Sequence, residues 1–205
     1  MSLAELGMIV NSNFSKPLNE QAREMKFCGS YVIENSQSFK PQKTGWYKVI
    51  VVGAGGASDS VSEATASGGA GGVAIKTLKL NLGETYEIEV TKFRSRFNSI
   101  VAFSGGDGKA KSSGGAGGTG GTASGGDYNY TGNDGVSNAY SYSSAASVGV
   151  YIPELMKKNS YMTSSGYFID SGYGVLGYGA SGKRYKEAEM QSQPGAVIII
   201  PLEVE

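Results

Sequence analysis

Side chains capable of acid–base or nucleophilic chemistry are scarce in this chain of 205 residues. It has no histidine, which is both the commonest general base and the commonest transition-metal ligand, so Ser-His-Asp and Cys-His arrangements are excluded. The single cysteine, Cys28, permits neither an intrachain disulfide nor a cysteine cluster for a metal. We therefore expect a protein that is not an enzyme, with no cofactor and no metal site.

The carboxylates also favour structural roles. Glu87 and Glu89 alternate with apolar residues, as on the solvent face of a strand. Asp107, Asp127 and Asp134 lie beside glycine or asparagine in turn-like contexts, where local hydrogen bonds would account for them. A weak calcium site at these aspartates is the alternative.

Residues 51–58, Val-Val-Gly-Ala-Gly-Gly-Ala-Ser, resemble at first sight a strand that enters a dinucleotide-binding turn. The residues that follow, up to Gly72, are rich in Ser, Ala and Gly and show no apolar periodicity, so no helix is expected after the turn. Without a helix N-terminus there is nothing to hold a pyrophosphate. The dinucleotide interpretation is therefore rejected.

Charge and hydropathy exclude two further classes of partner. The chain carries 18 basic and 18 acidic residues, its formal net charge is zero, and no basic stripe is present, so nucleic acid is not an expected partner. No apolar run approaches the roughly 18 residues that a membrane span needs, and no secretion signal is apparent at the N-terminus. We expect no membrane insertion.

The strongest pattern is a repeat of three residues. Gly114 to Thr122 contain three copies of a Gly-Gly-X triplet, and residues 68–73 contain two more. A period of three indicates an extended threefold helix of the polyproline II type. A flexible Gly/Ser linker is the alternative. Because ordered glycines are costly, an ordered structure requires that the Gly-rich strands hydrogen-bond to one another. These strands are residues 53–56, 68–72, 105–108, 114–126 and 166–182.

Between the glycines, the chain has strand character. Trp46 to Val52 form an apolar, β-branched run that predicts a strand buried on both faces. Residues 73–80 and 85–91 flank Asn81-Leu82-Gly83-Glu84, which predicts an antiparallel hairpin with positive φ at Gly83. Two further strands are expected at residues 99–104 and 196–200. Short strands separated by turn-rich insertions indicate an all-β sandwich.

The N-terminal part differs in composition. Pro17 to Phe27 contain good helix formers, with Pro17 acceptable at the first helical position and Gly29 as a stop, so we expect a short helix there. The chain is therefore divided into an N-terminal attachment or oligomerisation segment, residues 1–40, and a glycine-rich β-sandwich domain, residues 41–205.

The order of the motifs resembles a known family. The motifs are Phe39-Lys40-Pro41, residues 45–56, residues 68–73, residues 80–86 and residues 194–200. Over residues 39–202 their order and spacing are similar to the glycine-rich domain of phage and prophage tail proteins, as in the distal tail-fibre adhesins of T-even-type phages. The resemblance implies a small antiparallel β-sandwich whose glycine-rich insertions pack as polyglycine II helices. This chain departs from the family at Val90 to Arg94, where a Gly-rich turn is usual, and over the Ser/Tyr-rich residues 127–185.

The divergent region holds 10 of the 13 tyrosines. Binding loops made of Tyr, Ser, Gly and Asn recur in paratopes, because tyrosine offers a rigid ring and a hydroxyl at low entropic cost. The alternative is that these tyrosines cap the edges of glycine helices. Residues 153–158 are expected to form a surface turn within the region. The predicted receptor-binding residues are Tyr128, Asn129, Tyr130, Asn133, Tyr140 and Tyr142.

The resemblance implies that the chain is a phage or prophage tail (fibre) protein that recognises a bacterial surface receptor. The alternatives are a structural tail or baseplate assembly protein without receptor binding, and an enzyme that depolymerises surface polysaccharide. The implied partners are a bacterial surface glycan or outer-surface protein, other tail-fibre or baseplate subunits and, if the chain forms a homo-oligomer, further copies of itself. The protein would be made in the bacterial cytoplasm and located in the virion tail.

Overall fold

The computed structural model describes most of the chain from residue 30 onward. The described residues are 30–61, 64–111, 114–138, 142–143, 146–148, 150, 152–155, 160–162, 168–170, 176–179, 182–183 and 192–204. The helix predicted at Pro17 to Phe27, and Cys28, lie outside them. Tyr31–Glu205 form one compact unit.

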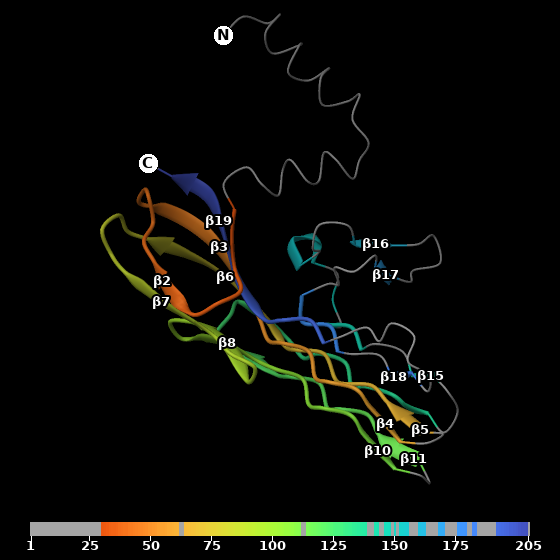
Figure 1. Cartoon of the computed structure of the whole chain (residues 1–205). Coiled ribbons are helices and arrows are strands. Elements are labelled where there is room, and N and C mark those ends of the chain that lie inside the picture. The colour runs from red at the N-terminus through yellow and green to blue at the C-terminus, as the bar shows by residue number, and fades with distance from the viewer. Residues whose placement is uncertain are drawn as a thin grey trace, which may run out of the picture. The chain divides into compact units, whose positions relative to one another are not determined.

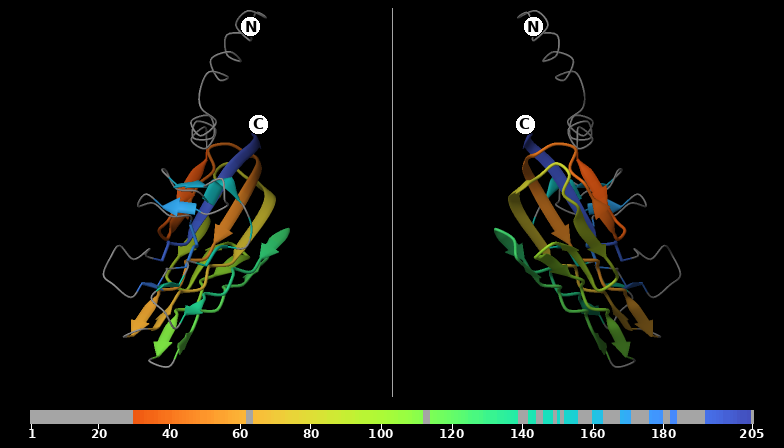
Figure 2. Two further views of the ribbon diagram at one scale, coloured as in Figure 1. Left: turned by 90° about the vertical axis from the view of Figure 1, so that its right-hand side faces the viewer. Right: turned by 90° about the vertical axis from the view of Figure 1, so that its left-hand side faces the viewer.

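Two five-stranded antiparallel sheets form a β-sandwich within this unit (Figures 1 and 2), which confirms the predicted fold class. Sheet I has the strand order β1 (Tyr31–Ile33), β19 (Ala196–Val204), β3 (Gly45–Val52), β6 (Val73–Leu80) and β13 (Tyr128–Tyr130). Sheet II has the order β12 (Ala123–Ser124), β9 (Ile100–Phe103), β8 (Arg94–Phe97), β7 (Tyr86–Val90) and β2 (Gln37–Phe39). β1 and β2 belong to these sheets, so the compact unit already includes residues 31–39, ahead of the domain start expected at residue 41.

Alternation along the strands builds the main core from both sheets. Val49 and Val51 of β3 are fully buried against residues of sheet II that include Phe97 and Ile100. The rings of Tyr86 and Phe97 stack with their centroids 5.6 Å apart. Glu87, between Tyr86 and Ile88, is exposed, as the alternating pattern predicts.

The opposite face of β3 contributes to a second core. Ile50 and Val52 are fully buried with Val148, Leu155 and Leu176, so the part of β3 from Val49 onward is buried on both faces as predicted. The prediction of a surface turn at residues 153–158 is wrong for the part that the structure describes. The 3₁₀ turn η1 (Pro153–Leu155) places Leu155 at 0% exposure in this core. The apolar face of sheet I needs a cover, and this turn supplies part of it.

The hairpin predicted from residues 73–80 and 85–91 is also wrong. Gly83 has the expected positive φ of 86°, and the Glu84 amide donates to the Asn81 carbonyl. However, β6 pairs with β3 and β13, whereas β7 pairs with β2 and β8, so the turn crosses from one sheet to the other. The amide of Leu82 bonds to the Thr44 hydroxyl and that of Asn81 to the Tyr86 hydroxyl. A local turn signal does not distinguish a hairpin from such an arch.

The glycine-rich segments that the structure describes pack side by side as predicted, and the linker alternative is rejected for them. Most of the predicted stretch 166–182 lies outside the described residues, and its residues 176–179 take part in this packing. We call residues 53–58, 67–72, 104–108, 117–122, 131–136 and 176–179 the glycine lattice. Its central segment, 67–72, bonds to every other segment. The hydrogen bonds are Gly56 N to Gly69 O (2.8 Å), Gly69 N to Gly106 O (2.9 Å), Gly118 N to Ser67 O (2.9 Å), Ala70 N to Asn133 O (3.0 Å) and Gly71 N to Gly177 O (2.8 Å).

Glycine is required in the lattice because neighbouring backbones occupy the place of a side chain. A Cβ on Gly69 would lie 2.1 Å from the Thr119 carbonyl oxygen, and one on Gly68 would lie 2.0 Å from that of Gly56. Ala70 of the central segment is buried in the second core instead. Mutual backbone pairing of side-chain-free strands thus satisfies the polar groups of segments that have few apolar side chains to bury.

The three aspartates differ from the prediction, and two of them join segments of the lattice while the third bonds to β6. Asp107 Oδ1 accepts from Ala57 N (2.8 Å), Asp127 Oδ2 from Thr77 N (3.0 Å) and Asp134 Oδ1 from Gly120 N (2.6 Å). The predicted local turn hydrogen bonds are therefore wrong for these acceptor atoms, since each carboxylate reaches a different segment. Amides at the edge of the lattice and of β6 lack a neighbouring carbonyl, and a carboxylate is a strong acceptor for them.

Candidate binding site

The chain leaves the sandwich in repeated excursions that all turn back at one end of the lattice. β3 continues through residues 53–58, and the chain returns through 67–72 to β6; β9 continues through 104–108, and the chain returns through 117–122 to β12. The short strands where the excursions reverse lie together, away from the sandwich (Figure 1). We call these strands the distal end: β4 (Asp59–Val61), β5 (Ala64–Ala66), β10 (Lys109–Lys111), β11 (Gly114–Ala116), β14 (Ser137–Asn138), β15 (Tyr142–Ser143) and β18 (Gly182–Lys183).

The distal end is held by short pairings among these strands. β4 pairs with β5, β5 with β14, β10 with β11, and β15 with β18, all antiparallel. Asp59 Oδ2 accepts a hydrogen bond from Ala110 N at 3.0 Å and so joins the first excursion to the second. The side chains of Lys109, Lys111 and Val136 are exposed there. A fixed backbone thus presents both cations and an apolar group.

The predicted receptor-binding residues do not form one loop. Tyr128, Asn129 and Tyr130 form β13, the edge strand of sheet I, where Tyr128 is opposite Ile75 and Tyr130 opposite Val73. Tyr128 is 63% exposed, whereas Tyr130 is half-buried against the second core. Tyr142 lies in β15 at the distal end, which pairs with β18 in a separate two-stranded sheet. Tyr140 lies outside the described residues.

The two predicted asparagines have structural partners. Asn129 closes the turn before β13, because its side chain both accepts from Gly126 N and donates to Gly126 O, each at 3.0 Å. Asn133 Nδ2 donates to Ser147 Oγ at 2.8 Å, and its backbone bonds to Ser147 and Ala70. Sequence reasoning missed these roles, since the partners of Asn133 are distant along the chain.

The tyrosines of the divergent region whose side chains are described differ in burial. Tyr178 packs with Tyr130 against the second core, and burial raises the pKa of its hydroxyl. Tyr128 is the exposed one among the tyrosines whose side chains are described in this region. Capping of apolar surface therefore accounts for Tyr130 and Tyr178, and Tyr128 remains available for contact with a partner.

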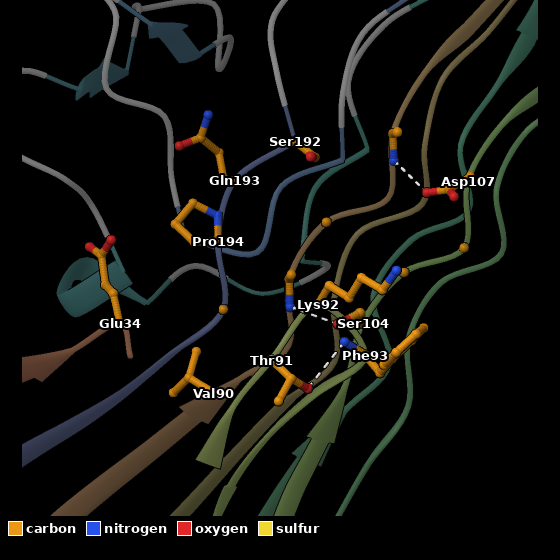
Figure 3. A pocket seen from close by; sticks show the side chains of 16 residues that line it. Glu34, Val90, Thr91, Lys92, Phe93, Ser104, Asp107, Ser192, Gln193 and Pro194 are labelled. Carbon is orange, nitrogen blue, oxygen red and sulfur yellow. Dashed lines mark hydrogen bonds between the residues drawn. The ribbon is translucent and has the colours of Figure 1, made fainter. Parts of the chain in front are cut away.

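A groove of about 690 Å³ lies where the lattice meets the sandwich (Figure 3). Its floor is largely backbone, from residues 54–57 and 104–107. The turn at Thr91 to Phe93 borders it, and residues 192–195 and Glu34 complete the lining. Sequence reasoning did not assign this groove, although the departure from the family pattern at Val90 to Arg94 falls on its wall.

A charge network stabilises the wall of the groove. Arg94 donates to both carboxylate oxygens of Glu89 (2.9 and 3.1 Å), and Arg96 Nε lies 3.2 Å from Glu89 Oε2. The hydrogen bond from Arg94 is the main reason that the pKa of Glu89 is lowered. The role of Glu89 is thus to hold the turn that follows β7.

The residues that the structure describes contain no candidate metal site and no candidate membrane-spanning helix. No group of three or more histidine, cysteine or carboxylate side chains that could hold a metal ion occurs among those residues. None of their helices is long and apolar enough to cross a membrane. No protein-family model matches the chain, and no curated protein matches it significantly.

Proposed function

We propose that this chain is a receptor-recognising module of a phage or prophage tail fibre, which contacts a glycan or protein on the bacterial surface. The observation that carries the proposal is the distal end, where the excursions of the lattice converge. Backbone hydrogen bonds fix the lattice, so residues at its end are held in place without an extensive apolar core beneath them. Such an arrangement suits contact residues that vary while the scaffold stays the same.

The resemblance of the motif order to tail proteins supplies the biological context of the proposal. Exposed Lys109, Lys111 and Val136 offer contacts to a partner, and pre-organised side chains lose little entropy on binding. The receptor-binding role of Tyr128 and Tyr142 remains part of the proposal, with Tyr128 at the sandwich and Tyr142 at the distal end.

Binding of the fluorescently labelled chain to a panel of bacterial strains tests the proposal. A distal variant carries Lys109→Ser, Lys111→Ser and Val136→Ser. A matched control carries Lys43→Ser, Lys79→Ser and Leu82→Ser, which removes the same charges and a similar exposed apolar group from the sandwich. Both variants are compared at equal folded fraction.

The proposal predicts strain-selective labelling that the distal variant loses and the control retains. A Tyr128→Ser variant reports separately on β13. Labelling of no strain, or equal labelling by the distal and control variants, would overturn the proposal and favour the assembly protein. In that case the exposed apolar residues of the sandwich, Val32, Trp46 and Leu202, are the first surface to examine for a neighbouring subunit.

A further inference from the structure

The groove between lattice and sandwich has features of a small-ligand site that the distal end does not share. Its volume of about 690 Å³ falls within the range of roughly 300 to 1,000 Å³ that is usual for ligand pockets. Because most residues of its floor are small, a ligand can approach the main chain closely there. The groove is bordered by a large aromatic residue and by charged side chains, which are considered in turn.

Phe93 presents its ring beside this groove. Its side chain is 69% exposed although the turn that carries it is firmly held. The Thr91 hydroxyl accepts from the amides of Phe93 (3.3 Å) and Arg94 (3.2 Å), and Ser104 N donates to the Phe93 carbonyl at 2.9 Å. Nothing in these contacts requires an aromatic side chain, because all of them involve the backbone of Phe93. An exposed ring on a rigid turn is a pre-organised stacking surface.

Polar groups lie within the same lining. Lys92 Nζ lies over the Phe93 ring, 4.8 Å from its centroid, and this flexible side chain has to move off that face before a ligand stacks there. Asp107 uses Oδ1 to accept from Ala57 N, while its Oδ2 accepts no hydrogen bond from the residues that the structure describes. Figure 3 shows Lys92 and Asp107 on one side of the groove and Glu34 on the other.

We propose that this groove binds a neutral pyranose sugar. The apolar C–H face of the ring stacks on Phe93, and the sugar hydroxyls donate to Asp107 Oδ2 and accept from Lys92. The Asp107 carboxylate disfavours acidic sugars, because a second carboxylate beside it is repelled. That the sugar comes from a bacterial surface glycan rests on the proposed function. The binding chemistry of the groove does not depend on that function.

The test uses the full chain and two probes, methyl glucopyranoside and glucuronate, with amide chemical shifts followed by NMR. The matched variants are Phe93→Ser and Leu82→Ser, since Leu82 is likewise an exposed apolar residue on a turn but does not line the groove. We expect the glucoside to shift the amides of residues 91–94 and 104–107. Its affinity should fall about tenfold in Phe93→Ser and remain unchanged in Leu82→Ser. Asp107→Asn keeps an acceptor for Ala57 N and removes the negative charge. We expect this variant to bind glucuronate.

Three results would overturn the inference: no shift with the glucoside, equal affinity of Phe93→Ser and the unmodified chain, or tighter binding of glucuronate than of the glucoside. The proposed function is tested separately from this inference. If Phe93→Ser loses sugar binding but still labels bacterial strains, the groove and the distal end act separately. If the chain labels no strain but still binds the sugar, only the proposed function is rejected.

Discussion

Substitution of Gly69 by alanine tests whether the lattice is a packed structure. Gly69 lies in the central segment, where an added Cβ would be 2.1 Å from the Thr119 carbonyl oxygen and 2.8 Å from that of Gly118. Both obstacles are backbone, so a segment must move by about an ångström to restore van der Waals contact. Two hydrogen bonds join at this residue, Gly69 N to Gly106 O and Gly56 N to Gly69 O, and such a movement breaks them.

The expected loss of stability follows from these two bonds. Each buried polar group left without a partner costs about 1 to 3 kcal/mol, which amounts to roughly 2 to 6 kcal/mol for the amide and carbonyl of Gly69 alone. Alanine lowers the entropy of the unfolded chain and returns about 0.4 to 1 kcal/mol. We therefore expect the free energy of unfolding to fall by about 2 to 5 kcal/mol, measured by urea denaturation with far-UV circular dichroism.

Gly83→Ala provides the matched control. Gly83 has φ of +86° with nothing within 4 Å of an added Cβ, so the same substitution there introduces backbone strain alone, about 1 to 2 kcal/mol. If Gly69→Ala proves no more destabilising than Gly83→Ala, the lattice tolerates side chains at its centre, and the packing argument is refuted.

Three further predictions concern the elements around the lattice. Leu155→Ala should lower the free energy of unfolding by about 2 to 5 kcal/mol in urea denaturation, because the side chain is fully buried in the second core; a surface-like effect under about 0.5 kcal/mol would contradict that placement. Asp107→Ala should cost about 1 kcal/mol by the loss of an acceptor for Ala57 N, and Asp107→Asn should recover most of it in thermal unfolding. The pKa of Glu89 is lowered mainly by its hydrogen bond from Arg94, so the stabilisation from this pair is complete above the unfolded pKa, near 4.5, and is lost as pH falls through the lower folded value. Glu89→Gln should therefore flatten the decline of the urea midpoint on acidification, and an unchanged slope would rule out the pair as its cause.

Local sequence predicts much of this fold because some patterns carry their own physical consequence. The Gly-Gly-X triplets require close neighbours, since side-chain-free strands have little else to stabilise them, and the lattice contains those neighbours. The apolar runs at residues 46–52 and 73–80 match β3 and β6 within one residue at each end. The positive φ at Gly83 follows from the turn residues alone.

The candidate site was less predictable, for a reason visible in its residues. Composition marks residues 128–142 as rich in tyrosine and asparagine, but it does not reveal that Tyr128 lies on a strand edge while Tyr142 lies at the distal end. Asn133 looked like a contact residue, yet its amide bonds to Ser147. The groove was missed because its lining comes from several separate stretches of the chain.

The sequence by itself determined the periodicities: which residues are extended, which strands lack side chains, and where the chain turns. Tertiary structure alone decided which segments of the chain pair with one another. β6 and β7 share a turn but belong to different sheets: β6 pairs with β3 over eight residues on one edge and with β13 on the other, and β7 pairs with β2 and β8. Asp107 likewise reaches Ala57, 50 residues away. Local geometry is set by nearest neighbours along the chain, whereas the choice among hydrogen-bond partners depends on which distant segments the fold brings together.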